Sequence, residues 1–136
     1  MLVKNIVSIV VIKSRQSFSW PGIPWVTGSG NNGLAAQAEH RIQFPTVAKS
    51  VLVASIDSES DKLYVHFISS GSGNVITGSH YYPLTQNRDA VSFNVRCSEI
   101  YISNPSAAPS GYVVVAELSD ISTSELAALT GSGISD

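Results

Sequence analysis

Acidic side chains stand at alternate positions in one short stretch, Asp57-Ser58-Glu59-Ser60-Asp61, which lies between two stretches with strand composition. Carboxylate oxygens at such spacing can ligate calcium. The stretch lacks the glycine and the distal glutamate of a calcium-binding helix–loop–helix. We therefore expect Asp57, Glu59 and Asp61 to form a solvated acidic turn that holds no metal ion.

Histidine and cysteine are the other residues with metal-binding or nucleophilic chemistry. His66 and His80 fall on or next to neighbouring predicted strands, and His40 stands apart from them. A catalytic zinc ion usually has three protein ligands, and no third ligand lies close in the sequence. The sequence therefore predicts no metal and no cofactor.

The single cysteine, Cys97, falls on the apolar side of an alternating stretch, where a free thiol behaves as a small hydrophobe. A cysteine–histidine dyad with His66 or His80 would require a third group to orient the base. The chain also lacks a glycine-rich phosphate loop and a G-x-S-x-G elbow. We expect no enzymatic activity.

Both tryptophans lie in the proline-containing stretch from Phe18 to Val26. Proline fixes an extended backbone and cannot donate a ladder hydrogen bond, so we expect an irregular aromatic segment. Three interpretations stay open: an anchor in a neighbour's pocket, a cap over the end of its own fold, or a carbohydrate-stacking platform that includes Tyr81 and Tyr82. The interface candidates are Arg15, Phe18, Trp20 and Trp25.

Charge excludes several classes of partner. Only 13% of the 136 residues are charged and the net charge is −2, which gives no general reason to bind nucleic acid or an anionic membrane. The apolar run Ile6–Ile12 is too short to span a bilayer. Residues 1–49 hold five basic residues and one acid, whereas residues 50–136 hold three basic and nine acidic residues. This asymmetry fits either a basic arm on an acidic partner or ordinary solvation.

The elements that would position these residues are strands. Valine and isoleucine number 27 against 8 leucines, and β-branched residues favour pleated strands. Alternation predicts Val65, Phe67, Phe93, Val95 and Val115 in the core, and a shift in the apolar parity predicts a β-bulge near Ser98-Glu99. The run Val113–Val115 is apolar on both sides and indicates a doubly covered strand or a subunit contact. The predicted strands are Ile6–Lys13, Arg41–Phe44, Val47–Ser55, Leu63–Ser69, His80–Leu84, Val91–Cys97, Ile100–Ser103 and Tyr112–Leu118.

Seven or eight short strands separated by turns predict one all-β domain, an antiparallel β-sandwich of jelly-roll-like type, over residues 1–136. We divide it into an extended N-terminal arm (1–40), a sandwich body (41–121) and a short helical tail (122–136). Ser122 and Glu125 have the spacing of a capping box at the start of that helix.

The chain from Phe44 onward resembles a family of small virion structural proteins of tailed bacteriophages. The resemblance covers about two thirds of the sequence and rests on framework segments rather than on an active site. It does not extend to the first 40 residues. The segments that carry it are Phe44–Val47 with Lys49–Val51, Val65–Phe67, Asn94–Ser103, Val115–Leu118 and Leu129–Ile134.

This resemblance implies a capsid decoration or cement protein, made in the host cytoplasm and located on the outer surface of the virion head. Its expected partners are the major capsid protein and sister subunits, the latter in a homotrimer. Two alternatives remain: a tail, neck or fibre component of the virion, and a carbohydrate-binding β-sandwich module.

Overall fold

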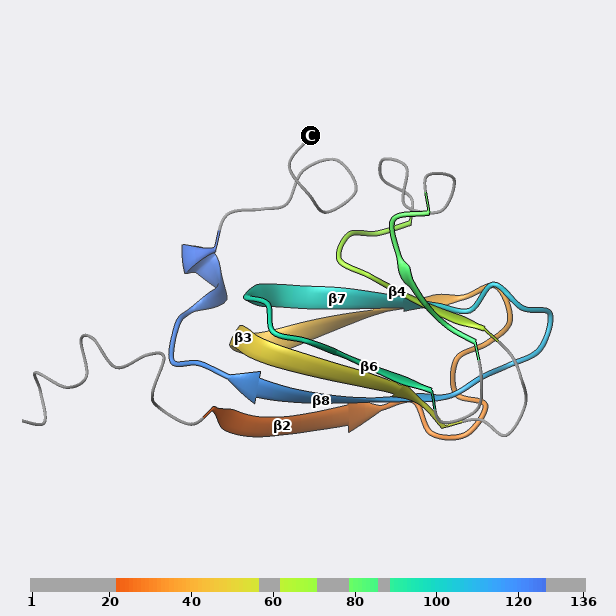
Figure 1. Ribbon diagram of the computed structural model, residues 1–136, viewed down its shortest axis with the longest axis horizontal. Coiled ribbons are helices and arrows are strands. Elements are labelled where there is room, and N and C mark those ends of the chain that lie inside the picture. Colours follow the sequence, from red (N-terminus) through yellow and green to blue (C-terminus); the bar gives the residue numbers. More distant parts are fainter. Residues whose placement is uncertain (1–21, 57–61, 71–78, 86–88, 127–136) are drawn as a thin grey trace, which may run out of the picture.

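A computed structural model describes residues 22–56, 62–70, 79–85 and 89–126 of the chain (Figure 1). These residues form an antiparallel sheet and one short 3-10 turn. The elements are β2 (Ile23–Gly28), β3 (Glu39–Ser55), β4 (Leu63–His66), β5 (Tyr82–Leu84), β6 (Ala90–Phe93), β7 (Cys97–Ser103), β8 (Tyr112–Leu118) and η1 (Thr123–Glu125).

Strand β3 runs across the molecule and folds back, as its two differently placed runs in Figure 1 show. Its last residue, Ser55, pairs with Tyr112 at the start of β8. Near its beginning, the His40 ring lies 2.8 Å from the hydroxyl of the same Tyr112. Both ends of a 17-residue strand therefore meet one residue, which is possible only if the strand reverses in its middle.

The reversal lies between Gln43 and Ala48, where the pairing of β3 with β7 shifts register. Pro45 stands inside this interval, where a missing backbone donor does not interrupt a regular ladder. Beyond it, the Val47 amide donates to the Ile121 carbonyl and its carbonyl accepts from Ser119. The chain after β8 therefore holds the bend in place. The predicted strands Arg41–Phe44 and Val47–Ser55 are thus two halves of one strand.

The two halves of β3 belong to different layers of a sandwich. The second half lies between β8 and β6, with β2 outside β8, and we name this sheet layer A. The first half pairs with β7, which continues to β4 and β5, and we name this sheet layer B. Counting the halves separately gives two four-stranded layers, and the chain changes layer at every connection except that between β4 and β5. This is the arrangement of a jelly roll, which confirms the predicted fold class.

The core lies between the layers and is mostly aliphatic. Val65 is fully buried as predicted, and the partly buried rings of Phe67 and Phe93 contact each other edge to face. Val115 and Val95 are instead exposed, so their assignment to the core was wrong. The fully buried large side chains are Leu34, Val47, Val51, Val53, Leu63, Val65, His66, Leu84, Ile100, Ile102 and Val114.

Two local geometries explain these errors. In β8 the even-numbered residues are buried, so Val115 points out of layer A. Strand β6 ends at Phe93 and β7 begins at Cys97, so Val95 lies in the connection between them. The predicted continuous strand Val91–Cys97 was therefore wrong. The change in apolar parity after Cys97 lies inside β7. The pairing of β7 with β3 shifts register there, between the partners of Cys97 and Glu99, so an irregularity lies at the predicted position, with the additional residues on β3.

The structure also adds a strand. Residues Ile23–Gly28 form β2, although the proline-containing segment was predicted to be irregular. Pro24 is tolerated because β2 is an edge strand among the described residues, and an outward-facing position needs no donor. The other boundaries differ less: β4 ends at His66, β5 starts at Tyr82, and β8 has the predicted bounds.

The C-terminal tail begins with the 3-10 turn η1 rather than with an α-helical capping box. The Ser122 side chain accepts from the Ser124 amide at 3.3 Å, whereas the predicted partner was Glu125. Residues 127–136, the N-terminal segment 1–21 with its predicted strand Ile6–Lys13, and the acidic turn at 57–61 lie outside the described residues.

Candidate functional site

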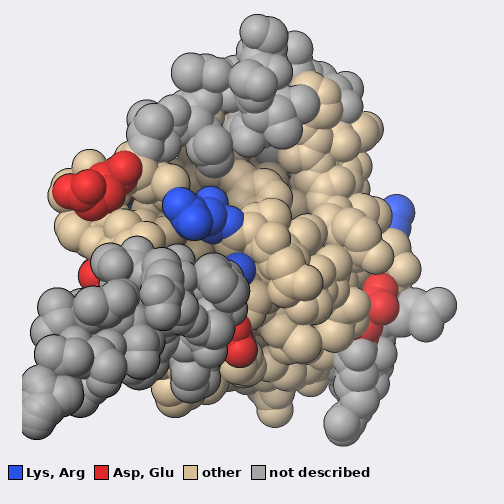
Figure 2. Space-filling view, turned by 60° about the vertical axis from the view of Figure 1, so that its left-hand side comes forward, with Lys and Arg blue, Asp and Glu red and all other residues tan. Residues whose placement is uncertain are grey.

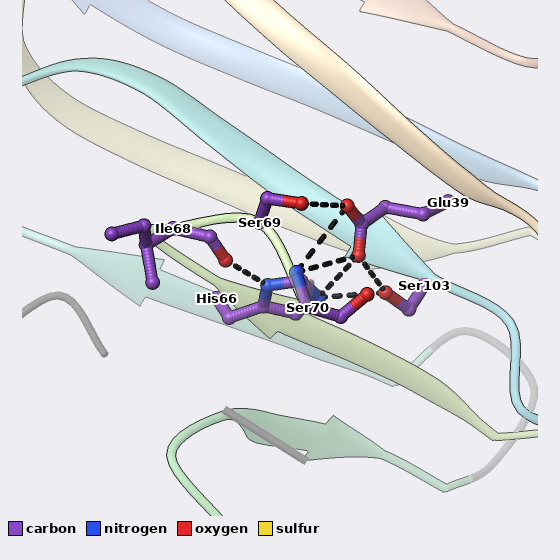
Figure 3. A network of polar contacts seen from close by, with 6 residues as sticks. All are labelled: Glu39, His66, Ile68, Ser69, Ser70 and Ser103. Carbon is purple, nitrogen blue, oxygen red and sulfur yellow. Dashed lines mark hydrogen bonds and ion pairs between the residues drawn. The ribbon is translucent and has the colours of Figure 1, made fainter. Parts of the chain in front are cut away.

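The outer face of layer B holds a network of polar side chains from three strands (Figure 3). His66 of β4 is completely buried, and its Nε2 lies 2.7 Å from the Ser103 hydroxyl on β7. That hydroxyl donates to Glu39 Oε1 at 2.9 Å, and the same carboxylate oxygen lies 3.6 Å from His66 Nε2. The strand register brings these residues together, because Glu39 pairs with Ser103 and His66 pairs with Tyr101, two residues before Ser103 on β7.

The chain that follows β4 folds over this network and closes it. His66 Nδ1 donates to the Ile68 carbonyl at 2.7 Å. The Ser69 hydroxyl and the Ser70 amide donate to the Glu39 carboxylate at 3.1 and 3.2 Å. The segment 67–70 thereby covers the outward-facing side chains of Glu39, His66 and Ser103. The hydrogen bonds to Glu39 and His66 hold this segment against layer B.

Burial and hydrogen bonding act in opposite directions on the two titratable groups. Burial of Glu39 would raise its pKa, but hydrogen bonds from Ser70, Ser103 and Ser69 outweigh it, so the pKa lies below the ordinary 4.5. Burial lowers the pKa of His66 below 6.5, opposed by its bond to Ile68 and by the charge of Glu39. Hydrogen bonding therefore favours the charged form of Glu39, and burial disfavours the charged form of His66.

The network contains serine, histidine and glutamate, but its geometry differs from that of a catalytic triad. In a triad the acid orients the ring nitrogen opposite the one that faces the nucleophile. Here Ser103 and Glu39 both face Nε2, and a backbone carbonyl takes the other nitrogen. Ser103 is only 9% exposed and its hydroxyl is engaged on both sides. This arrangement fixes the loop and does not present a nucleophile.

A second polar group adjoins the network on layer B. Arg41 forms an ion pair with Glu99 at 2.6 Å, and the Tyr101 hydroxyl donates to the other carboxylate oxygen at 2.9 Å. The Tyr101 ring stacks on His66, with centroids 5.9 Å apart. Burial and then the bond to Glu99 raise the pKa of Tyr101. Polar groups on this face are thus satisfied by one another.

The remaining candidate residues that the structure describes do not assemble a reactive centre. Cys97 is buried, which raises its pKa to about 11 and keeps it a thiol. His40 is bonded to Tyr112, and His80 lies on the exposed approach to β5. Within the described ranges there is no group of three or more His, Cys, Asp or Glu side chains that could hold a metal ion. Asp57, Glu59 and Asp61 are not among the described residues.

Of the predicted interface residues, only Trp25 is described, and it packs against its own domain. Its ring meets Phe44 edge to face, with centroids 5.3 Å apart, at the border of the core. The observed contact corresponds to the interpretation of an aromatic cap over the same fold. Arg15, Phe18 and Trp20 lie outside the described residues.

The outer face of layer A differs in kind, because it carries apolar side chains that nothing described covers. Val26, Val115 and Leu52 stand side by side on β2, β8 and β3, and they are 64%, 40% and 37% exposed. On one side of this row, the next row in register consists of small apolar residues. On its other side lies one acidic residue, Glu117. That neighbouring row consists of Gly28, Val113, Ala54 and Ala90.

Large contiguous apolar patches are uncommon on the surface of monomeric proteins. We name the residues Val26, Leu52, Ala54, Val113 and Val115 the layer A face. Its sequence signal was the run Val113–Val115, which is apolar at successive positions where a one-sided strand would alternate. Figure 2 shows, on another side of the molecule, that charged side chains are isolated within a mostly uncharged surface.

No family model matches the chain, and no curated protein matches it in sequence. In the part of the chain that the structure describes, no helix is long and apolar enough to cross a membrane.

Proposed function

We propose that the protein is a structural component of a phage virion, a decoration or cement protein that binds the outer surface of the head. The observation that carries this proposal is the layer A face, an exposed apolar surface on a jelly roll. Its central row, Val26, Val115 and Leu52, is in register across three hydrogen-bonded strands, so the backbone ladder fixes the relative positions of these side chains. A rigid apolar surface suits permanent attachment to another protein better than binding of a small polar ligand.

The polar chemistry of the molecule is consistent with this role. The Glu39–His66–Ser103 network is closed by its own loop and lies away from the layer A face, on the opposite layer. The fold thereby supplies one surface for attachment and one that is sealed. The resemblance of residues 44–134 to virion structural proteins gives the partner, the major capsid protein.

The carbohydrate-binding alternative has weaker support. Trp25 is partly buried and packs edge to face with Phe44 of its own domain. Tyr81 is stacked on Tyr64 at 3.7 Å, and Tyr82 meets Phe93. The described stacking candidates Trp25, Tyr81 and Tyr82 therefore each contact another ring of the same domain, and Trp20 lies outside the described residues. A tail or neck location remains the alternative within the virion, and counting copies per particle separates it from the head.

Binding of the purified protein to undecorated heads tests the proposal. Val115→Asp places a charge at the centre of the layer A face, and we expect at least a tenfold increase in the concentration needed for half occupancy. Ala107→Asp is the matched control, because it adds the same charge to an exposed loop and should bind as the parent does. Circular dichroism verifies that both variants fold. Equal occupancy by the parent and Val115→Asp would overturn the proposal.

A further inference from the structure

The β2 edge of layer A has a defined hydrogen-bonding pattern. The Ser29 amide donates to the Tyr112 carbonyl, so residue 29 faces β8. Backbone groups alternate in direction along a strand, so the odd-numbered residues of β2 also face β8 and the even-numbered residues face outward. The outer edge therefore presents the N–H groups of Val26 and Gly28 and the carbonyls of Pro24, Val26 and Gly28. Pro24, which has no N–H, stands where none is required.

This pattern is complementary to itself under a two-fold rotation. Two β2 strands related by such an axis are antiparallel, and an axis at Val26 places each Val26 opposite its own copy. Each Val26 amide then donates to the other Val26 carbonyl, and each Gly28 amide donates to a Pro24 carbonyl. The only bonds lost to proline are the two in which Pro24 would donate to Gly28.

The side chains of β2 also favour this pairing. The strand has the sequence Ile-Pro-Trp-Val-Thr-Gly and carries no charge, so two copies meet without like-charge repulsion. Natural edge strands usually carry charges that prevent such pairing. Ile23 and Val26 are instead 50% and 64% exposed. No described residue pairs with the outer edge of β2.

The layer A face becomes continuous across the same axis. Val26 lies at its edge, so self-pairing joins the two rows into one, ordered Leu52, Val115, Val26 and then the same residues of the second copy in reverse. With strands about 4.8 Å apart, four strands span roughly 20 Å, and pairing doubles this width to about 40 Å. Self-pairing therefore enlarges the apolar surface that is available to a partner, and larger buried areas are typical of permanent complexes.

We infer that two copies of this chain associate through the β2 edge, with Val26 on the two-fold axis, and present one eight-stranded apolar surface. The inference deepens the proposed contact with sister subunits and rests on it. It can nevertheless be tested without capsids, so failure to dimerise and failure to bind heads are separate results. A two-fold contact differs from the homotrimer expected from the resemblance.

Cysteine crosslinking tests the register directly. In a hydrogen-bonded antiparallel pair the Cα atoms lie about 5.5 Å apart, which is within the range of a disulfide. Val26→Cys should therefore give a covalent dimer under mild oxidation. Ser92→Cys, exposed on β6 at the opposite edge of the same layer, should stay monomeric in the denaturing gel. The buried Cys97, with a pKa of about 11, contributes no background.

Sedimentation equilibrium of the full chain measures the association itself. We expect a dimer for the parent and a dissociation constant at least tenfold larger for Val26→Lys, which puts two like charges opposite each other. Val26→Thr keeps the branched shape and the backbone donor, and it should dimerise within about threefold of the parent.

Four results would overturn the inference. The first is a parent that is monomeric up to about 1 mM, which would mean that the edge is covered by the chain's own N-terminal segment or by another protein. The second is a dimer that Val26→Lys leaves intact, and the third is equal crosslinking of Val26→Cys and Ser92→Cys. A trimer in which Val26→Cys does not crosslink would overturn it as well.

Discussion

The outer faces of layer A and layer B of this jelly roll differ in the chemistry of their side chains and in whether described residues cover them. On layer B the polar outward residues Glu39, His66 and Ser103 lie beneath the segment 67–70, which hydrogen-bonds to Glu39 and His66. On layer A the outward residues are apolar, and no described residue covers them. Identical backbone architecture can thus yield a face that stabilises the domain and a face available to a partner.

The difference between the faces has energetic consequences. Polar groups buried on layer B stabilise the fold only while every partner remains, because an orphaned buried group costs about 1–3 kcal/mol. Valines exposed on layer A contribute little to folding, since they are not removed from water. Substitutions on layer B should therefore lower stability, and those on layer A should affect association.

The largest expected effect on stability is that of His66→Ala. The substitution leaves a cavity and removes partners from Ser103 and the Ile68 carbonyl, so we expect a loss of about 3 kcal/mol. Urea denaturation compares it with Val115→Ala on layer A, which should lie within about 0.5 kcal/mol of the parent. Similar losses for the two variants would contradict the contrast between the faces.

Phe93→Ala should have the next largest effect. Its ring contacts Phe67 and Tyr82 and joins the inner side of β6 to layer B. Because the side chain is only partly buried, we expect about 2 kcal/mol, less than the 3–5 kcal/mol of a fully buried phenylalanine. A melting temperature equal to that of the parent would show that β6 does not pack across the sandwich.

Stability should fall on acidification because of layer B. The pKa of Glu39 is lowered from 4.5, so its contribution is complete above that value and is lost as the pH falls through the lower pKa of the folded state. The pKa of His66 is lowered from 6.5, so the unfolded chain takes up a proton that the folded chain does not, and stability again falls with pH. Melting temperatures measured from pH 7.5 to 4 should therefore decrease.

Glu39→Gln should flatten the part of this profile below about pH 5, because the titrating carboxyl is gone. Glu125→Gln, on the exposed turn η1, alters the net charge equally and serves as the control. A profile that keeps the parent's slope in Glu39→Gln would assign the acid sensitivity to other groups.

The smallest effect is expected at the rim of layer B. Arg41 pairs with Glu99 at the surface, where solvent and salt screen the charges, so Arg41→Ala should leave the melting temperature almost unchanged. A large decrease that disappears at high salt would show that the ion pair belongs to the stabilising network.

The sequence predicted the jelly-roll-like sandwich and most of its strands because alternation and β-branched composition are local signals. It did not predict β2, since Pro24 marks irregular structure unless the strand is known to lie at an edge. It placed Val115 in the core, because apolar residues on both sides of a strand do not indicate which side is covered. The run Val113–Val115 is apolar at successive positions, so it indicates that a partner covers the outer side of β8.

The polar network was beyond sequence reasoning for a different reason. Glu39, His66 and Ser103 are 27 to 64 residues apart, and only the register of β3, β7 and β4 places them side by side. The sequence offered His66 as a metal ligand or a catalytic base. Its burial and its bond to the Ile68 carbonyl depend on a loop that folds back over it, and the sequence does not show that loop. The role of Ser69 and Ser70 in closing the site has no sequence pattern of its own.

The most direct test of the central claim is a reconstruction of the decorated particle at a resolution that shows side chains. We expect Val115 and Leu52 of the layer A face to lie against capsid subunits, with the Glu39–His66–Ser103 side of the molecule turned away from that contact. A reconstruction in which the layer A face points into solvent while layer B meets the head would contradict the account.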